Sequence, residues 1–301
     1  MKLSIITINR NNVAGLRKTL ASVELQTCRD IEHIIVDGAS TDGSVEVIED
    51  YVRKVVSQES RVKSVSWTSE PDDGIYNAIN KGIKRATGDY VWILNSGDCA
   101  ASPDVVERMI AALRQTSDVS MYDVSTSAEV AMLMGNIVQV YPDGRKVREA
   151  KLHSCEDATP RLIDASMLTF YRGTIPHDAA FVRRDLFEKY GYFDESMKIC
   201  ADWKLYLDMI ALGGVVPMYV DIDVVYFDMS GISNANNELR FAERRAYLEQ
   251  VLPLAVLKDY DRYGDDIAIM QRLHRHPWAF GLTRFLERVL FKLEKWGILR
   301  R

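Results

Sequence analysis

The sequence predicts an α/β fold in which a mostly parallel sheet is flanked by helices and followed by a helical C-terminal extension. Short β-branched runs alternate with amphipathic segments four times within residues 1–115. From residue 236 onward, apolar residues recur at helical spacing. The 301 residues, 47% of them hydrophobic, are enough for one large α/β domain with a helical appendage.

The elements expected in the first part of the chain follow from hydrophobic periodicity. Strands are predicted at residues 3–8, 31–36, 62–67 and 90–94. Helices are predicted at residues 16–23, 42–55, 75–85 and 103–113. We expect Gly88 to end the third helix in a left-handed conformation and Pro103 to lie in the first turn of the fourth. Such alternation is typical of a parallel sheet wound with helices.

The alternation stops after residue 115. Residues 116–178 mix short strands and loops, 184–212 predict helix, 215–227 predict strands and 236–301 predict helices.

Composition and charge narrow the class of protein. The formal net charge of -5 argues against general affinity for nucleic acid. The four cysteines, Cys28, Cys99, Cys155 and Cys200, form no CxxC pair, so we expect reduced thiols in a cytoplasmic protein. No stretch reaches the roughly 18 apolar residues that a membrane-spanning helix needs.

The C-terminal tail differs in charge from the rest of the chain. Residues 272–301 contain eight Lys or Arg and two Glu, and residues 278–296 form a basic amphipathic helix rich in aromatics. This pattern is typical of contact with a membrane surface, here the inner face of the membrane. The same apolar side would also suit packing on the rest of the chain or on a partner subunit, so the oligomeric state stays open.

Acidic loops follow three of the predicted strands. They are VDGASTDGS at 36–44, SEPDDG at 69–74 and NSGD at 95–98. Because parallel strands end at the same edge of a sheet, these loops predict a ligand site there. Their oxygen atoms suit a divalent cation and a diphosphate. No GxGxxG follows the first strand and no P-loop occurs, so a bound nucleotide needs another device, such as a metal bridging its phosphates.

Several polar residues have both a structural and a functional interpretation. Asn77 and Asn80 fall inside a predicted helix, where Asn is unfavourable without a specific partner. The side chain of Lys81 likewise has two interpretations, contact with a phosphate and exposure to solvent. Asp202 falls at or near the start of a predicted helix, so it suits a helix cap, a catalytic base or both. His177 precedes an apolar strand.

The chain resembles the family 2 glycosyltransferases, which have the GT-A fold, and especially their bacterial polysaccharide-building branch. The similarity lies in SIITINRN at 4–11, in the acidic loops, in the helix and strand between them and in HDAAFVRRDLFEKYGYFDESMKICADWKLYL at 177–207. It implies a catalytic domain at 1–228, with a nucleotide-binding half at 1–115 and an acceptor-binding half at 116–228. Residues 229–301 would form the extension.

The resemblance also implies an activity. Such enzymes move a sugar, with inversion, from a nucleotide-diphosphate donor, most often a UDP-sugar, to a hydroxyl of a glycan or lipid-linked acceptor. By position, Asp202 matches the catalytic base, and His177 matches a residue on the acceptor side. Asp98 matches the last acid of the motif that holds Mn²⁺ or Mg²⁺. The implied donor-binding residues are Thr7, Asn9, Asp37, Asp72, Asn77, Lys81, Asn95 and Ser96.

The sequence departs from the family pattern at three places. NSGD leaves Asp98 as the only carboxylate of the metal motif, because Asn95 or Ser96 stands where the first acid is expected. Asp178 stands where Gln is common, and Asn77 where an acid is frequent.

Two other functions compete with sugar transfer. A nucleotidyltransferase uses a similar sheet and metal carboxylates but usually a basic, Gly-rich loop after the first strand. Residues 9–18 offer only Arg10, Arg17 and Lys18. A non-catalytic carbohydrate-binding relative is the other alternative, and the presence of both Asp98 and Asp202 argues against it.

Overall fold

The computed structural model describes residues 1–57, 60–115, 130–149, 161–163, 165–229, 236–274, 276–296 and 298. The chain divides into two compact units, Met1–Arg245 and Ala246–Arg301. Cys155 lies outside the described residues, and Cys28, Cys99 and Cys200 are free thiols. The boundary expected at residue 228 falls inside the first unit.

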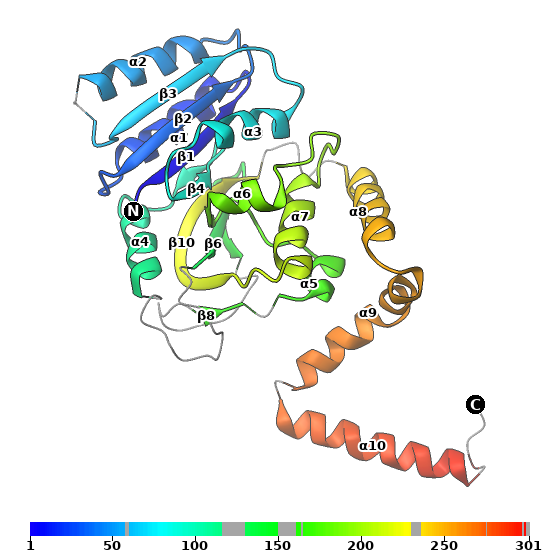
Figure 1. Cartoon of the computed structure of the whole chain (residues 1–301). Helices are drawn as coiled ribbons and strands as arrows, with labels where there is room; N and C mark the ends of the chain where they lie inside the picture. The colour runs from blue at the N-terminus through cyan, green and yellow to red at the C-terminus, as the bar shows by residue number, and fades with distance from the viewer. Residues whose placement is uncertain are drawn as a thin grey trace. The chain divides into compact units, whose positions relative to one another are not determined.

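Within the described residues, all the strands belong to the first unit (Figure 1). The strands are β1 (Leu3–Asn9), β2 (Ile31–Asp37), β3 (Ser64–Ser69), β4 (Tyr90–Ile93), β5 (Cys99–Ala100), β6 (Met132–Val140), β7 (Lys146–Glu149), β8 (Arg161–Leu162), β9 (Ala180–Arg183) and β10 (Met218–Asp228). Its helices are α1 (Val13–Glu24), α2 (Ser44–Val56), α3 (Ile75–Arg85), α4 (Val105–Gln115), α5 (Met167–Arg172), α6 (Asp185–Tyr190), α7 (Ala201–Tyr206) and the π-helix η2 (Leu207–Leu212). Helix α8 (Asn237–Val251) begins in the first unit and ends in the second.

The strands form one ten-stranded sheet in the order β3-β2-β1-β4-β9-β6-β10-β5, with β7 paired to β6 and β8 to β10. Strands β1 to β4 pair in parallel, whereas β9 is antiparallel to both β4 and β6. The α/β class with a mostly parallel sheet is therefore confirmed.

The register of the parallel strands aligns their carboxyl ends. Asn9 of β1 lies opposite Asp37 of β2, and Asp37 lies opposite Ser69 of β3. The polar loops that follow these strands therefore start at the same edge of the sheet, as expected.

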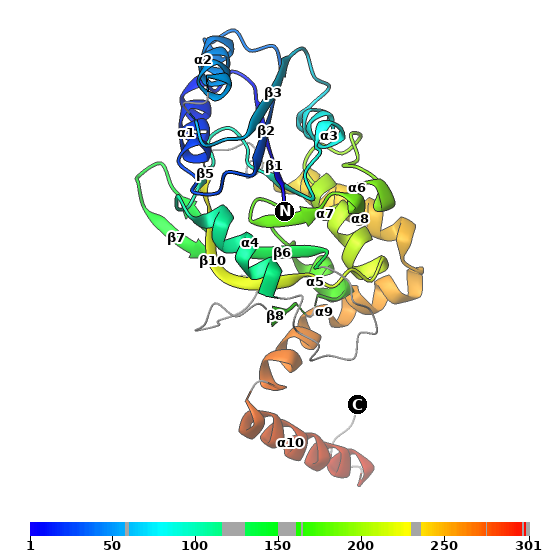
Figure 2. The ribbon, with the colours of Figure 1, turned by 60° about the vertical axis from the view of Figure 1, so that its left-hand side comes forward.

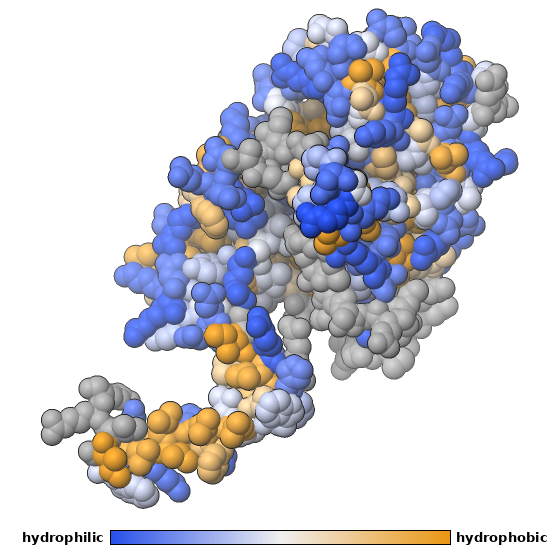
Figure 3. Space-filling view, turned by 180° about the vertical axis from the view of Figure 1, so that it is seen from behind, coloured by the Kyte–Doolittle hydropathy of each residue, from blue (hydrophilic) through white to orange (hydrophobic). Residues whose placement is uncertain are grey.

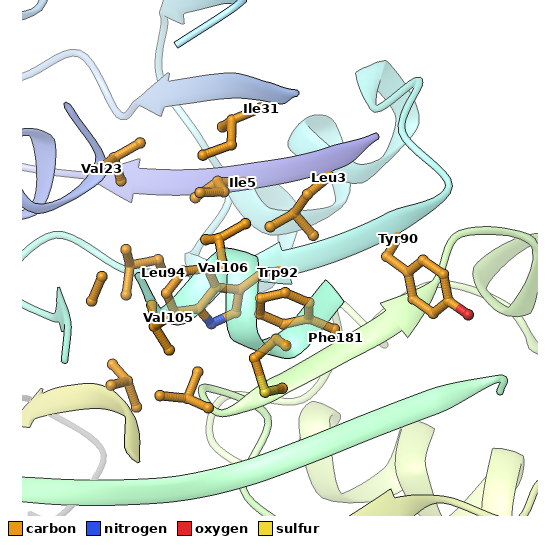
Figure 4. Packing of buried hydrophobic residues seen from close by; sticks show 14 of the residues in the cluster. Leu3, Ile5, Val23, Ile31, Tyr90, Trp92, Leu94, Val105, Val106 and Phe181 are labelled. Atoms are coloured by element: carbon orange, nitrogen blue, oxygen red, sulfur yellow. The ribbon is translucent and has the colours of Figure 1, made fainter. Parts of the chain in front are cut away.

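Helices cover both faces of the parallel strands. Figure 2 shows α1 and α2 on one side of β1–β3 and α3 on the other. Leu3 and Ile5 of β1 belong to the hydrophobic cluster on the side of α1 and α2 (Figure 4). Ile6 faces α3, where a Cβ on Gly82 would lie 2.4 Å from its Cγ2 atom. The alternation of side chains along β1 thus fills both layers.

Trp92 of β4 links this core to the segment around residue 178. It is fully buried and packs against Phe181 with 5.3 Å between ring centroids (Figure 4). Its indole Nε1 donates a hydrogen bond of 2.7 Å to the carbonyl oxygen of Asp178. Core packing therefore fixes the backbone beside His177.

Two expectations need correction. Helix α3 ends at Arg85, but its C-cap is Ala86 in an extended conformation, and Gly88 is absent from the positive-φ residues. Gly88 instead permits a close backbone approach, since a Cβ there would lie 2.7 Å from the nitrogen of Ser4. The helix expected at 184–212 is broken between α6 and α7, because Gly191 adopts a φ of 93° and turns the chain.

The second unit contains α9 (Leu254–His274) and α10 (Pro277–Lys295), in agreement with the helical pattern. None of the described side chains of α10 is buried. Hydrophobic side chains gather along this helix in Figure 3. No helix in the described part of the chain combines the length and hydrophobicity needed to span a bilayer.

Candidate active site

A pocket of 610 Å³ opens at the carboxyl edge of the parallel strands. Its lining comprises Ile8, Asn9, Arg10, Asn12, Asp72, Gly74, Ile75, Ala78, Asn95, Ser96, Asp98, Phe227 and Asp228. Residues from all three acidic segments were expected to meet, and Asp72 and Asp98 from two of them line the pocket. Asp37, from the third segment, does not line the pocket but accepts a hydrogen bond from Asn9, which does.

Asp37 is fully buried, and both of its carboxylate oxygens have protein partners. Oδ1 accepts hydrogen bonds from Asn9 Nδ2 (2.8 Å) and Ser40 Oγ (2.6 Å), while Oδ2 accepts from Ser69 Oγ (2.7 Å). Burial alone would raise the pKa of Asp37, but the hydrogen bonds from Ser40, Ser69 and Asn9 lower it overall. The carboxylate therefore ties the ends of three strands together.

One consequence of these bonds is the orientation of Asn9. Its Nδ2 is held by Asp37, so its buried Oδ1 is left without a hydrogen-bond partner among the described residues. The Oδ1 of Asn95 is also buried and also lacks a hydrogen-bond partner among the described residues. Both Asn9 and Asn95 line the pocket. Both amide oxygens are enclosed in this structure, so a hydrogen bond to the N–H or O–H group of a ligand requires these side chains to turn toward the pocket.

Three other predicted donor-binding residues are engaged by protein groups. Thr7 is buried, and its hydroxyl donates to the carbonyl oxygen of Leu94 at 2.9 Å. Lys81 lies 2.9 Å from a carboxylate oxygen of Glu70 and donates to the carbonyl of Pro71, so it secures the acidic loop. The Ser96 hydroxyl donates to the carbonyl of Asn12 at 3.3 Å.

Asp72 reaches the pocket because Gly38 leaves it room. A Cβ on Gly38 would lie 2.3 Å from Oδ2 of Asp72. The side chain of Asp72 is 7% exposed and lies 3.8 Å from the guanidinium of Arg10, which is 66% exposed. Arg10 thus places a long, mostly exposed cationic side chain at the rim of a pocket whose other charged lining residues are acids.

Asp98 is the most deeply placed carboxylate of the pocket, with 4% of the residue exposed. Its Oδ1 accepts a hydrogen bond of 2.9 Å from the backbone nitrogen of Asp228. Burial and the charge of Asp178 raise the pKa of Asp98 well above its usual value. A cation in the pocket would favour the ionised form of this carboxylate.

Asp202 lies in the first turn of α7, whose N-cap is Cys200. Its carboxylate oxygens are directed at side chains: Oδ2 is 3.2 Å from Nδ1 of His177, and Oδ1 is 3.4 Å from the hydroxyl of Tyr76. The Tyr76 hydroxyl also donates to the carbonyl of Ile199 at 2.6 Å. The Asp202 side chain is 19% exposed, so it is shielded but reachable.

His177 connects the two parts of the site. Its Nε2 lies 3.1 Å from Asp178 Oδ1, opposite the contact with Asp202. Burial would lower the pKa of His177, but the charges of Asp178, Asp202 and Asp98 raise it to about 9. Burial would raise the pKa of Asp202, but the hydrogen bond and charge of His177 lower it overall. Asp202 and Asp178 thus contact the imidazole directly, while Asp98 contributes only through its charge, and Asp202 does not line the pocket itself.

Asn77 and Asn80 hold the segment that precedes α7. Asn80 is buried, donates to the carbonyl of Phe193 at 2.8 Å and accepts from the nitrogen of Phe193 at 3.0 Å. Asn77 donates to a carboxylate oxygen of Glu195 at 2.8 Å. These contacts explain why Asn occurs inside α3.

Comparison with known proteins identifies the chain. Residues 4–191 match the family model described as Glycosyl transferase family 2. The chain is 30% identical over 285 residues to an uncharacterized glycosyltransferase of Mycobacterium tuberculosis, covering 94% of this chain and 87% of that protein. The protein belongs to glycosyltransferase family 2. It is also 27% identical over 242 residues to a PGL/p-HBAD biosynthesis glycosyltransferase of Mycobacterium bovis, covering 80% of this chain and 82% of the relative.

Solved structures show that this family 2 glycosyltransferase has the GT-A fold. TarS of S. aureus (residues 1–349), solved in complex with UDP-GlcNAc, matches 76% of this chain and 58% of its own, with a TM-score of 0.57 and 19% identity. The chain thus spans less than two thirds of that protein. The mannosyltransferase PcManGT of Pyrobaculum calidifontis, in complex with GDP-Man and Mn2+, gives a TM-score of 0.54 at 16% identity over 93% of this chain and 72% of its own.

Tyr76 and Asp228 are among the residues of this family 2 glycosyltransferase that the sequence pattern did not indicate. Tyr76 falls among apolar positions of α3, so its pattern indicates only packing, and indeed it stacks on Phe193 at 5.7 Å. Asp228 ends β10, and only the pairing of β10 with β5 brings it beside Asp98. A sequence pattern contains neither contact, because each joins segments more than a hundred residues apart.

Proposed function

We propose that the protein is an inverting glycosyltransferase that moves a sugar from a nucleotide-diphosphate sugar, with a UDP-sugar as the favoured donor, to an acceptor hydroxyl. The proposal rests on one observation above all. Asp98 lines a polar pocket at the carboxyl edge of the strands, and Asp202 is a partly exposed carboxylate 3.2 Å from His177, the residue whose pKa both acids raise. We assign Asp98 to the donor and Asp202 to the acceptor.

The pocket suits a nucleotide sugar. Its 610 Å³ and its lining of amide, hydroxyl and carboxylate groups fit a ligand with many hydroxyl and N–H groups. The complexes of TarS with UDP-GlcNAc and of PcManGT with GDP-Man support a donor of this class.

The donor set also suits a divalent cation. Asp98 would hold it, and Asp228 lines the same pocket. The described residues contain no cluster of three His, Cys, Asp or Glu side chains for a complete site, but Mg²⁺ is often bound through one or two carboxylates, substrate phosphates and water. The Mn2+ complex of PcManGT supports the assignment. When bound, the cation would offset the charge that develops on the leaving diphosphate.

In the proposed mechanism, Asp202 is the general base. As the acceptor oxygen bonds to the anomeric carbon, the bond from that carbon to the diphosphate breaks, and the hydroxyl proton passes to Asp202. Attack opposite the leaving group inverts the anomeric configuration. His177 and Tyr76 hold the carboxylate, and the lowered pKa of Asp202 keeps it ionised at neutral pH.

Product analysis tests this function. The full-length protein, incubated with Mn²⁺, a panel of nucleotide sugars and glycan or lipid-linked acceptors, should release free nucleoside diphosphate. NMR of the product should show an inverted anomeric linkage. Release of pyrophosphate instead would indicate a nucleotidyltransferase, and donor binding without turnover for any acceptor would favour the non-catalytic alternative.

Helix α10 supports a further part of the proposal, contact with an anionic membrane surface. Trp278, Val289 and Trp296 fall on one stripe of the helix and are 76%, 36% and 67% exposed. Basic residues such as Arg288 and Lys292 fall on another stripe. An exposed apolar stripe with aromatic ends and basic flanks suits a helix that lies in the lipid headgroup region.

Vesicle sedimentation tests this contact. The full chain should sediment with phosphatidylcholine vesicles that contain phosphatidylglycerol and much less with phosphatidylcholine alone. Replacing Leu286 and Val289 together by Gln should weaken binding at least about tenfold through lost apolar burial. Thr283→Gln, on the polar side, is the matched control. A wild-type chain that stays in the supernatant with anionic vesicles contradicts the proposal.

A further inference from the structure

The segment that leads into α7 is held by a carboxylate from α8. Oε1 of Glu243 accepts a hydrogen bond from the backbone nitrogen of Lys198 at 2.6 Å. Its Oε2 accepts from the nitrogens of Ile199 (3.1 Å) and Cys200 (2.9 Å). Three successive N–H groups thus converge on one carboxylate, a concave anion-binding arrangement of backbone. Hydrogen bonds to an ionised acceptor are about twice as strong as neutral ones.

These three N–H groups directly precede the turn that carries Asp202. Cys200 is the N-cap of α7, and Asp202 lies two residues later. The peptide of Ile199 is held on both sides, because Glu243 accepts from its nitrogen and Tyr76 donates to its carbonyl. Tyr76 also reaches Oδ1 of Asp202 at 3.4 Å. Movement of this segment would therefore displace the carboxylate of Asp202.

The neighbour of Glu243 acts on the same turn. The guanidinium of Arg244 lies over the ring of Trp203, with 5.2 Å to the ring centroid. Trp203 is fully buried and donates through Nε1 to the carbonyl of Phe170 at 2.8 Å. Helix α8 thus fastens the start of α7 through two consecutive side chains, one bound to backbone and one packed on an aromatic ring.

We propose that Glu243 is a positioning residue for sugar transfer, acting through Asp202. By fixing residues 198–200, it holds the Asp202 carboxylate where the acceptor hydroxyl presents its proton. This inference rests on the proposed role of Asp202 as general base. Glu243 lies beyond residues 4–191, the part of the chain that matches the family model.

The test compares two substitutions of Glu243 with a control on the same helix. Glu243→Gln keeps the size of the side chain but opposes an NH₂ group to backbone N–H donors, whereas Glu243→Asp keeps the charge. Glu238→Gln changes an exposed residue of α8. We expect Glu243→Gln to lower kcat by about 10- to 100-fold, the range that a misplaced catalytic group costs, with donor affinity unchanged. Glu243→Asp should retain more activity than Glu243→Gln, and Glu238→Gln should match the wild type.

A double substitution separates positioning from a general structural role. If Glu243 acts through Asp202, Asp202→Asn combined with Glu243→Gln should be no slower than Asp202→Asn alone. Multiplied losses, a parallel loss of donor affinity, or a wild-type kcat for Glu243→Gln would each overturn the inference. If Asp202→Asn itself turns over at the wild-type rate, the proposed base and this inference both fail. If Asp202→Asn is inactive and Glu243→Gln is normal, only the inference fails.

Discussion

The proposed donor side and the proposed base side of this site are built in different ways. On the donor side, the register of parallel strands brings Asn9, Asp37 and Ser69 to one edge, and the pocket forms around the loops that follow. On the base side, Asp202 sits on a six-residue helix that follows a long loop. Its position depends on side chains of other segments, among them Tyr76 and Glu243. Sheet pairing is cooperative and tolerant of single side-chain changes, whereas a position fixed by a few side-chain contacts is sensitive to each of them.

The largest effect is expected from a substitution that removes the proposed base and leaves the proposed donor side unchanged. Asp202→Asn preserves shape but removes the proton acceptor, so kcat should fall by about 10²- to 10⁴-fold. Donor affinity, measured by isothermal titration calorimetry, should stay within about twofold, because the donor contacts lie on the strand ends. A variant with wild-type turnover would show that Asp202 serves only the start of α7.

The imidazolium between the two sides should make stability depend on pH. The pKa of His177 is raised from 6.5 to about 9, so its contribution is fully present below pH 6.5 and is lost as the pH rises through about 9. In EDTA, the difference in unfolding free energy between the wild type and His177→Gln should shrink by up to about 3 kcal/mol from pH 6 to pH 9.5. Denaturant titrations measure this difference, and the exposed His276→Gln variant should show none of it. A difference that stays constant across this range would mean that His177 is not charged in the folded protein.

The smallest of these effects concerns the donor side. Asp98→Asn should weaken Mn²⁺-dependent binding of the donor by about tenfold, since a neutral amide is a poorer ligand than a carboxylate. Calorimetry with and without Mn²⁺ measures the change, and Asp73→Asn, an exposed acid nearby, is the control. Wild-type donor affinity that ignores Mn²⁺ would remove the metal from the proposal.

The same contrast explains how much could be predicted from the sequence. Periodicity predicted β1 to β4 and the convergence of their polar loops, because strand spacing and parallel pairing are local rules. It did not predict that Asp37 is fully enclosed by Asn9, Ser40 and Ser69, because burial depends on the neighbouring strands.

The base side was harder to predict. The polar interior of α3 showed that Asn80 needed a partner, but the partner, Phe193, lies more than a hundred residues away. Asp202 was found through its family motif, while Tyr76 and Glu243 were missed because their contacts exist only in the folded chain.

Helix α8 runs without interruption from Asn237 to Val251, across the division at residue 245, with Glu243 just before it. The position at which the chain is truncated for crystallisation or screening therefore matters. A stop codon placed directly after β10 would keep every described strand and every residue that lines the pocket, yet the shortened chain would lack the glutamate proposed to align Asp202. If the proposal for Glu243 holds, this shortened chain would bind the donor but show no transfer in an activity assay. A truncated chain should therefore end no earlier than the end of α8.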